Sequence, residues 1–267
     1  MSLQTTQNQP LIVERVGPVE TFVINDAPRN RMTVEFMDAL EREITRVAAD
    51  GKVRAVVIRG AGAENFSVGM DLKQLSSGIK RAGSLDAFFD QRLRVLRQIE
   101  NLNKPVIAVL YGYCLGGGLE LPLACHFRLA AVEGARIGLP ELDLGTVTAW
   151  GGSARLTRCV GRNHALDMIL RSKMLSGPEA LAIGLVNEVW PIGELFARAD
   201  ALAHELADKP SLAVAAMLRC IVGSGHKSLD DALADERRAV HETLGSPDQL
   251  EGMQAFLEKR KPQFNKA

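Results

Sequence analysis

The chain lacks the cysteine patterns of disulfide-rich and zinc-binding proteins. Its 267 residues include only four cysteines, and no two of them are spaced as C-x-x-C. Small secreted domains and structural zinc sites usually carry paired cysteines at short spacing. We therefore expect inert, buried thiols in a reducing compartment, and no metal site.

The chain also lacks an excess of charge and a long apolar run. Lys and Arg together number 32, as do Asp and Glu, so the formal net charge is zero. Proteins that bind nucleic acids or anionic membranes usually carry a basic excess. No apolar run reaches the roughly 18 residues of a membrane-spanning helix, and residues 1–10 show no secretion signal or Arg-rich presequence. These absences predict a cytoplasmic protein with no nucleic-acid or membrane partner.

The richest stretch of the sequence is PVIAVLYGYCLGGGLELPLACHF, residues 105–127. Its apolar run 106–110 predicts a buried strand, and the glycine triplet 116–118 leads into a predicted helix. The N–H groups at such a helix start are unpaired and lie at the positive end of the helix dipole, where they bind a phosphate or stabilise an oxyanion. Glu120 lies three residues after Gly117, over the same helix face. The spacing matches neither the dinucleotide fingerprint nor a P-loop, and by itself the triplet is equally well explained by tight packing.

The rest of the chain divides near residue 192. Before this point, β-branched runs alternate with helical periodicity; after it, strand signals stop and four helices with apolar faces are predicted. The small, polar segment 76–84 is predicted to be a surface loop, and Arg92, Arg94 and Arg97 to lie on a solvated helix face. Strands are expected at 11–16, 19–24, 53–59, 127–132 and 185–190, and helices at 34–49, 85–102, 151–160, 162–171, 193–208, 211–223, 228–244 and 247–259.

Three separated motifs carry a family resemblance. NFSVGMDLK at 65–73, GYCLGGGLE at 112–120 and RIGLPELDLGTVTAWGGSARLTRCVG at 136–161 occur in the order found in the enoyl-CoA hydratase/isomerase family, the crotonases. The chain resembles this family from about Val13 to its C-terminal segment. The resemblance implies an α/β fold, a ββα superhelix: residues 1–192 would form the spiral core with the active site, and residues 193–267 a helical trimerisation region.

The resemblance also implies a set of reacting groups. Water adds to the 2,3 double bond of an acyl-CoA thioester, and negative charge moves to the thioester oxygen. The backbone N–H groups of Met70 and Gly117 would stabilise that charge. Glu120 and Glu141 would hold the water and exchange protons, since two close carboxyl groups titrate apart; which is acid and which is base stays open. Taken singly, Glu120 is also explained as an exposed helix residue and Glu141 as a helix cap.

Coenzyme A would be part of the substrate, with no further cofactor. By resemblance, Val68, Asp71, Leu72 and Lys73 line the groove for its adenine end, although Lys73 is equally an ordinary surface lysine. The resemblance further implies that Phe256 and Lys259 contact the coenzyme bound to a neighbouring subunit. The expected assembly is therefore a homotrimer or a dimer of trimers.

Two departures from the family pattern stand out. Thr148-Ala149-Trp150 occupies the place where hydratases commonly have Pro-Gly-Ala, beside the acyl pocket. Trp150 either narrows that pocket and favours short or planar acyl groups, or fills a gap between the core and the C-terminal helices. His126 stands where the family usually has Asp, and we expect a packed, hydrogen-bonded side chain there.

Enoyl-CoA hydration is the favoured activity, and two alternatives stay open. One is another crotonase reaction on a CoA thioester: isomerisation, dehydration or decarboxylation. The other is an RNA-binding role, for which the arginines at 92, 94 and 97 are the only support. The acyl group, the pathway and the source organism do not follow from the sequence.

Overall fold

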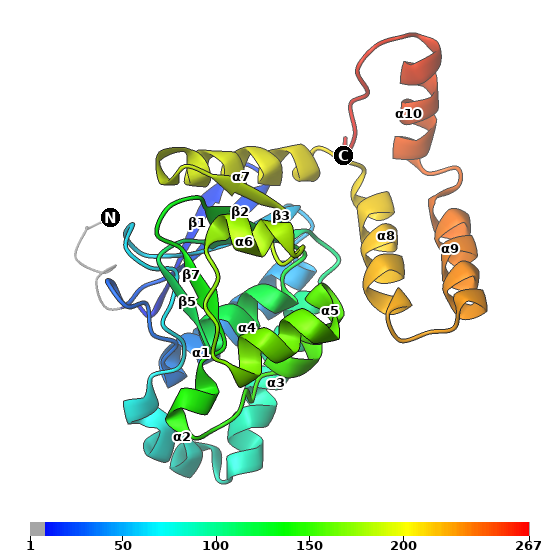
Figure 1. Cartoon of the computed structure of the whole chain (residues 1–267). Coiled ribbons are helices and arrows are strands. Elements are labelled where there is room, and N and C mark those ends of the chain that lie inside the picture. The colour runs from blue at the N-terminus through cyan, green and yellow to red at the C-terminus, as the bar shows by residue number, and fades with distance from the viewer. Residues whose placement is uncertain (1–8, 267) are drawn as a thin grey trace.

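A computed structural model describes residues 9–266, so most of the polar N-terminal segment used in the targeting argument lies outside the described residues. The fold is built on a six-stranded sheet in the order β1-β2-β3-β4-β6-β8 (Figure 1). β1 pairs with β2 antiparallel, and every later pair in the sheet is parallel. The strands are β1 Leu11–Val16, β2 Val19–Ile24, β3 Ala55–Gly60, β4 Val106–Leu110, β6 Phe127–Ala131 and β8 Glu188–Trp190.

A second, two-stranded parallel sheet and six α-helices complete the body of the chain. Its strands, β5 Tyr113–Leu115 and β7 Arg136–Gly138, each follow a strand of the large sheet, so the strand-strand-helix unit predicted from the sequence is present. The helices are α1 Val34–Ala49, α2 Leu75–Ala82, α3 Leu85–Glu100, α4 Gly117–Ala124, α5 Gly152–Leu170 and α6 Gly177–Ala182, with 3₁₀ turns η1 Leu72–Gln74 and η2 Glu141–Leu144.

The helix α1 shows how the sequence pattern becomes structure. The Thr33 hydroxyl accepts a hydrogen bond from the N–H of Phe36 at 3.1 Å and so caps the helix. The predicted apolar face of Met37, Leu40, Ile44 and Val47 is at most 1% exposed. Burying such a side chain contributes about 1.5–3 kcal/mol, so this face fixes the helix against the sheet.

Two predictions are wrong: one concerns the segment before α3, and the other concerns Arg92 on α3 itself. Residues 76–84 are not a loop, because 75–82 form α2, which ends at Gly83 in a left-handed conformation with φ 89°. Gly78 is the buried residue of this helix, and the ring of Phe88 lies where a side chain at Gly78 would be. The small residues that suggested flexibility therefore permit close packing of α2 on α3.

Arg92 does not lie on a solvated face. It is 1% exposed, and its guanidinium lies 3.4 Å from the ring centroid of Phe88. Its Nη1 donates to the carbonyl of Phe88 at 2.8 Å, and burial lowers its pKa to about 10. The ring and the carbonyl compensate in part for the lost hydration. Arg94 and Arg97 are exposed as predicted.

The other predicted elements are found with small shifts of their ends. The helical segments predicted on either side of Gly161 are joined in α5, and Gly161 breaks the helical geometry with φ 77°. The strand expected at 185–190 is shorter and spans 188–190. His126 is packed and hydrogen-bonded as predicted: its Nδ1 accepts from the N–H of Val106 at 3.0 Å, and burial lowers its pKa to about 4.

The four C-terminal helices are α7 Ile192–Ala207, α8 Ser211–Ser224, α9 Leu229–Thr243 and α10 Pro247–Leu257. Of these, α7 packs against the body, where the ring of Phe196 lies 5.1 Å from that of Tyr111. The other three, which we call the arm (residues 211–257), stand away from the body (Figure 1). The helical region predicted after residue 192 thus contains one helix packed on the core and three that extend from it.

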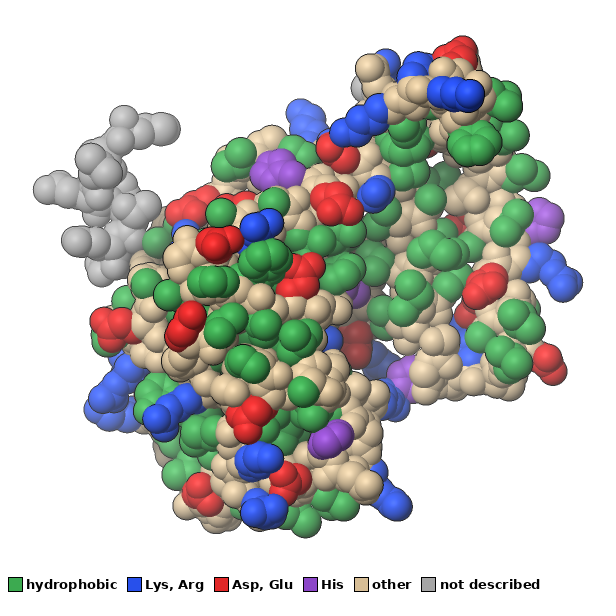
Figure 2. All heavy atoms as spheres, turned by 45° about the horizontal axis from the view of Figure 1, so that its top comes forward, with side chains coloured by type: hydrophobic (Ala, Val, Ile, Leu, Met, Phe, Trp, Pro, Cys, Tyr) green, Lys and Arg blue, Asp and Glu red, His purple; other side chains and the backbone are tan. Residues whose placement is uncertain are grey.

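The arm carries many large apolar side chains that the rest of the described chain leaves exposed. Within the described chain, each of its helices buries a single residue, Ala216, Ala239 or Ala255. Figure 2 shows hydrophobic side chains along the arm, with a hollow between it and the body. Within residues 9–266, no helix is both long and apolar enough to cross a membrane.

Candidate active site

The two predicted oxyanion donors lie on adjacent backbone segments. A Cβ atom on Gly69 would lie 3.2 Å from the nitrogen of Gly117, so only a glycine leaves the space beside that N–H open. Gly69 also has φ +89°, which side chains rarely adopt. The segment is held by hydrogen bonds from the N–H of Met32 to the carbonyl of Gly69, 2.8 Å, and from the N–H of Asp71 to the carbonyl of Met32, 3.3 Å.

The N–H groups of Met70 and Gly117 are free to bind a ligand. Within the described part of the chain, neither of them donates to another protein group. Gly117 is the first residue of α4, where N–H groups have no partner inside the helix and the dipole favours negative charge. The arrangement suits an oxygen that carries negative charge.

Glu120 lies one turn further along α4 and is 3% exposed. Its Oε1 accepts hydrogen bonds from the N–H groups of Trp150 at 2.7 Å and Gly152 at 2.9 Å. Burial raises its pKa to about 7, an effect that these two donors and Arg155 oppose and that nearby Glu141 reinforces. Glu120 therefore exchanges a proton near neutral pH, and it is not an exposed helix residue.

Glu141, the first residue of η2, brings a second carboxyl group to the same place. Its Oε1 lies 3.0 Å from the position of a Cβ on Gly116. Its Oε2 is buried and has no hydrogen-bond partner within the described chain. Burial raises the pKa of Glu141 above its ordinary value. An unpartnered buried oxygen of this kind is costly, which is understandable if it binds a water or a substrate.

Trp150 is 2% exposed, and its ring packs against Gly117. It therefore lies beside the donor and carboxyl groups and forms part of the core cluster. The sequence predicted a residue that either lines the acyl pocket or fills a gap. Its position next to Gly117 agrees with the first alternative, whereas its burial is that of a packing residue.

The residues predicted to line the coenzyme groove lie on both sides of Met70 in the sequence. Asp71 caps η1 by accepting from the N–H of Lys73 at 3.2 Å, and Leu72 and Lys73 are exposed. Val68 is half-buried, and its N–H donates to the carbonyl of Arg29 at 3.0 Å. Along this segment Leu72 and Lys73 are exposed, whereas Val68 and Asp71 are half-buried and Gly69 is buried.

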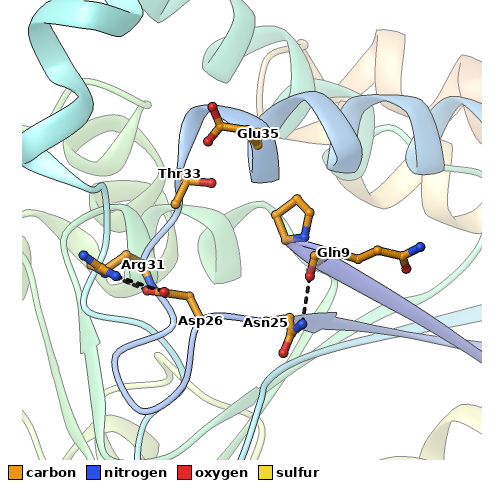
Figure 3. Close-up of a pocket in the computed structure, with 7 residues that line it drawn as sticks. Gln9, Asn25, Asp26, Arg31, Thr33 and Glu35 are labelled. Atoms are coloured by element: carbon orange, nitrogen blue, oxygen red, sulfur yellow. Dashed lines mark hydrogen bonds and ion pairs between the residues drawn. The ribbon is translucent and has the colours of Figure 1, made fainter. Parts of the chain in front are cut away.

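A hollow is lined by residues of the segments 9–10, 25–26 and 31–35, among them Asp26 and Arg31 (Figure 3). Arg31 points to Asp26, with its Nε 2.6 Å from Oδ2, and its Nη1 lies 3.5 Å from Oδ2 of Asp71. Arg31 thus links the segment 25–35 to Asp71. Burial raises the pKa of Asp26, but the hydrogen bonds and charge of Arg31 outweigh this effect, so the pKa lies below its ordinary value. Arg31 thereby helps fix Asp71 beside the groove.

Phe256 and Lys259 lie apart from the other predicted residues. Phe256 is 83% exposed on α10, and Lys259 follows that helix. The chain does not bring them to its own site, as Figure 1 shows from the position of α10.

Two further residues contribute to the site but are not predicted from the sequence. Gly152 supplies an N–H to Glu120, and Arg155 donates to the carbonyl of Trp150 at 2.8 Å. The pair Gly151-Gly152 at a helix start was the available signal, but backbone donors and a charged residue one turn later are not specific enough to be recognised alone.

Comparison with known proteins gives the family. The sequence model of the family described as "Enoyl-CoA hydratase/isomerase" matches residues 19–267. The chain belongs to this family. The family member of Bacillus subtilis described as "Probable enoyl-CoA hydratase" is 38% identical over 251 residues, which cover 92% of this chain and 95% of that protein. The "Short-chain-enoyl-CoA hydratase" of Clostridium acetobutylicum is 34% identical over 252 residues, 94% of this chain and 95% of that one.

The fold agrees with the family. The crystal structure of an enoyl-CoA hydratase from Bacillus anthracis superposes with a TM-score of 0.90 at 31% identity, and covers 96% of this chain and 99% of its own. The predicted family and the α/β crotonase fold with a helical C-terminal region are therefore confirmed.

Proposed function

We propose that this protein is an enoyl-CoA hydratase that adds water across the 2,3 double bond of an acyl-CoA thioester. The observation that carries the proposal is the juxtaposition of two carboxyl groups with raised pKa values, Glu120 and Glu141, and two unpaired backbone donors, Met70 and Gly117. The hydratase names of similar family members support it.

The proposed reaction uses each of these groups once. The water oxygen bonds to the β-carbon while one glutamate accepts a proton from the water. The electrons of the double bond shift towards the α-carbon and the thioester oxygen, which receives hydrogen bonds from Met70 and Gly117. The other glutamate, protonated, delivers a proton to the α-carbon. Removing one such oxyanion donor typically costs about 3–4 kcal/mol of transition-state stabilisation.

We further propose that the substrate's coenzyme A lies along Val68, Asp71, Leu72 and Lys73, and that the reaction needs no metal or additional cofactor. The support is that these residues flank Met70 directly and that Leu72 and Lys73 are exposed, while proton transfer and oxyanion stabilisation complete the chemistry. Phe256 and Lys259 would contact the coenzyme of a neighbouring subunit in a homotrimer or a dimer of trimers.

We also propose a cytoplasmic location. The support is that Cys114, Cys125, Cys159 and Cys220 are all free and that the first two are buried, as expected in a reducing compartment. The alternative of a role in RNA binding loses one of its three arginines, because Arg92 is buried.

The test of the activity is a hydration assay with crotonyl-CoA. Loss of the absorbance of the conjugated enoyl thioester, with 3-hydroxybutyryl-CoA as the product, is the expected result. A shifted double bond or released carbon dioxide would instead identify another reaction of the family. No turnover of any enoyl-CoA from four to about ten carbons would contradict the proposal.

A further inference from the structure

Arg155 contacts the backbone of residues 150–152, which also holds Glu120. Its Nη1 donates to the carbonyl oxygen of Trp150 at 2.8 Å. Its Nη2 and Nε contact the two carboxylate oxygens of Glu100, at the end of α3, at 3.0 and 3.3 Å. The side chain of Arg155 is only 13% exposed. Charge-assisted, two-pronged contacts of this kind define the direction of the guanidinium as well as its position.

The same backbone segment donates two hydrogen bonds to Glu120. The N–H of Trp150 donates to Glu120 at 2.7 Å while the carbonyl of Trp150 accepts from Arg155. The second donor to Glu120, the N–H of Gly152, lies on the far side of Gly151, whose φ is +93°. Any rotation of the Trp150–Gly151 peptide plane would move its carbonyl and the following backbone together. The carbonyl that Arg155 binds therefore belongs to the peptide unit between the N–H groups of Trp150 and Gly152, the two donors that orient the carboxylate of Glu120.

We infer that Arg155 is a positioning residue for Glu120, acting through the backbone of Trp150, and that Glu100 in turn holds Arg155 in place. The inference rests on the proposed function for its consequence in turnover. The carboxylate must lie within a few tenths of an ångström of its productive position beside the reacting water, and misplacement of a reacting group by about 1 Å can reduce turnover by about 100-fold. A rigid loop is therefore part of the reacting geometry.

A purely structural role of Arg155 makes different predictions. The ion pair between Arg155 and Glu100 joins α5 to α3, so its loss would lower stability whatever happens at Glu120. Such a role leaves turnover unchanged in a variant that folds, and it changes the proton affinity of Glu120 only through the lost charge of Arg155. A role through charge alone also differs, because a lysine at position 155 would preserve it.

The experiment compares Arg155→Met and Arg155→Lys with Arg158→Met as the matched control. Arg158 is exposed on the same helix and contacts His226 at 3.0 Å, away from Glu120. With crotonyl-CoA, Arg155→Met is expected to lower kcat by about 10- to 100-fold with little change in KM, and Arg155→Lys to recover only part of it. Arg158→Met is expected to behave like the parent.

A second measurement does not depend on turnover. The titration of Glu120 is followed by carbon-13 NMR of the side-chain carboxyl groups, and its signal is assigned with Glu120→Gln. Loss of oriented N–H donors and of the nearby positive charge raises the pKa of Glu120, so the midpoint should move to higher pH in Arg155→Met. In Arg155→Lys, which keeps the charge, part of the shift should remain.

Each outcome decides the inference separately from the proposed function. A parent that hydrates no enoyl-CoA contradicts the proposed function, and the Glu120 titration still decides the inference. An unchanged titration in Arg155→Met, or full recovery of both kcat and titration in Arg155→Lys, would overturn the positioning role. If Arg155→Met does not fold, Arg155→Lys and Glu100→Gln carry the test: an upward shift in both supports the inference, and the parent's value in either contradicts it.

Discussion

The indole ring of Trp150 covers the backbone of Gly117. A Cβ atom on Gly117 would lie 2.6 Å from Cζ3 of the ring and 2.9 Å from Cη2. Such distances are shorter than a carbon–carbon contact by about 1 Å. The residue whose N–H is the proposed oxyanion donor therefore has an aromatic ring on one side, and any side chain there meets the indole first.

Gly117→Ala is expected to destabilise the protein by about 1–3 kcal/mol, the usual cost of overpacking, and to reduce kcat with crotonyl-CoA. The reason is that the ring of Trp150 or the α4 backbone must move, and either shift disturbs the N–H donor. Chemical denaturation and steady-state kinetics on the same samples give both quantities. A variant with the parent's stability and rate would contradict this geometry.

The double variant Gly117→Ala with Trp150→Ala provides the control. Because the two groups occupy the same space, the stability losses should be less than additive. Strict additivity would mean that the added methyl group does not collide with the ring.

Trp150→Ala by itself tests the specificity hypothesis. If the indole limits the acyl pocket, its removal should raise kcat/KM for an enoyl-CoA of about ten carbons relative to crotonyl-CoA. The variant should also lose about 3–5 kcal/mol of stability, as large-to-small core changes do, so Trp150→Phe is a milder companion. An unchanged ratio in folded variants would make Trp150 a packing residue and place the acyl specificity elsewhere.

The sequence predicted those features that depend on periodicity or on motif position. Helical spacing predicts the apolar face of Met37, Leu40, Ile44 and Val47. These side chains are at most 1% exposed. Glu120 and Glu141 were identified from motif positions, and the structure brings both to one place. Such features can be predicted because each of them depends on the types and spacing of a few neighbouring residues.

The features that the sequence did not predict depend on contacts between distant segments. A glycine among small polar residues suggests a loop at Gly78, yet Gly78 lies in α2 and packs against the ring of Phe88 on α3. Arg92 is predicted to be a surface charge, yet its guanidinium is buried against the same ring. The role of Arg155 follows from the direction of one backbone carbonyl, that of Trp150, which no side-chain pattern records.

Glu120→Gln and Glu141→Gln are each expected to lower kcat by about 10²–10⁴-fold, the usual contribution of acid–base groups. Substrate binding should persist, because the shape of the site is kept and the glutamine oxygen at position 120 can still accept from Trp150 and Gly152. Stopped-flow rates and equilibrium binding of a non-reactive acyl-CoA separate the two effects. Near-normal turnover in either variant would contradict its assignment.

The raised pKa of Glu120 also predicts how stability depends on pH. In the folded protein the group titrates at about 7, against 4.5 ordinarily. Below the lower value both states are protonated; as the pH rises to about 7 the folded state alone retains the proton, so stability is lost over this interval. The full loss is on the order of 3 kcal/mol. Glu120→Gln should therefore gain stability relative to the parent between about pH 5 and about pH 8, measured by urea unfolding. A constant difference would contradict the shift.

The exposed apolar side chains of the arm indicate that the chain forms an oligomer. Ile221 on α8, Leu229 on α9 and Leu257 on α10 are 68%, 75% and 78% exposed, and contiguous apolar surface of this kind usually marks an interface. We expect a trimer or a hexamer by light scattering at micromolar concentration. Leu257→Asp should weaken the assembly, because a charge buried at an apolar interface costs several kcal/mol, whereas Lys52→Asp, on an exposed turn of the body, should leave it intact. A monomeric parent would contradict the prediction and would leave Phe256 and Lys259 without a neighbouring site to contact.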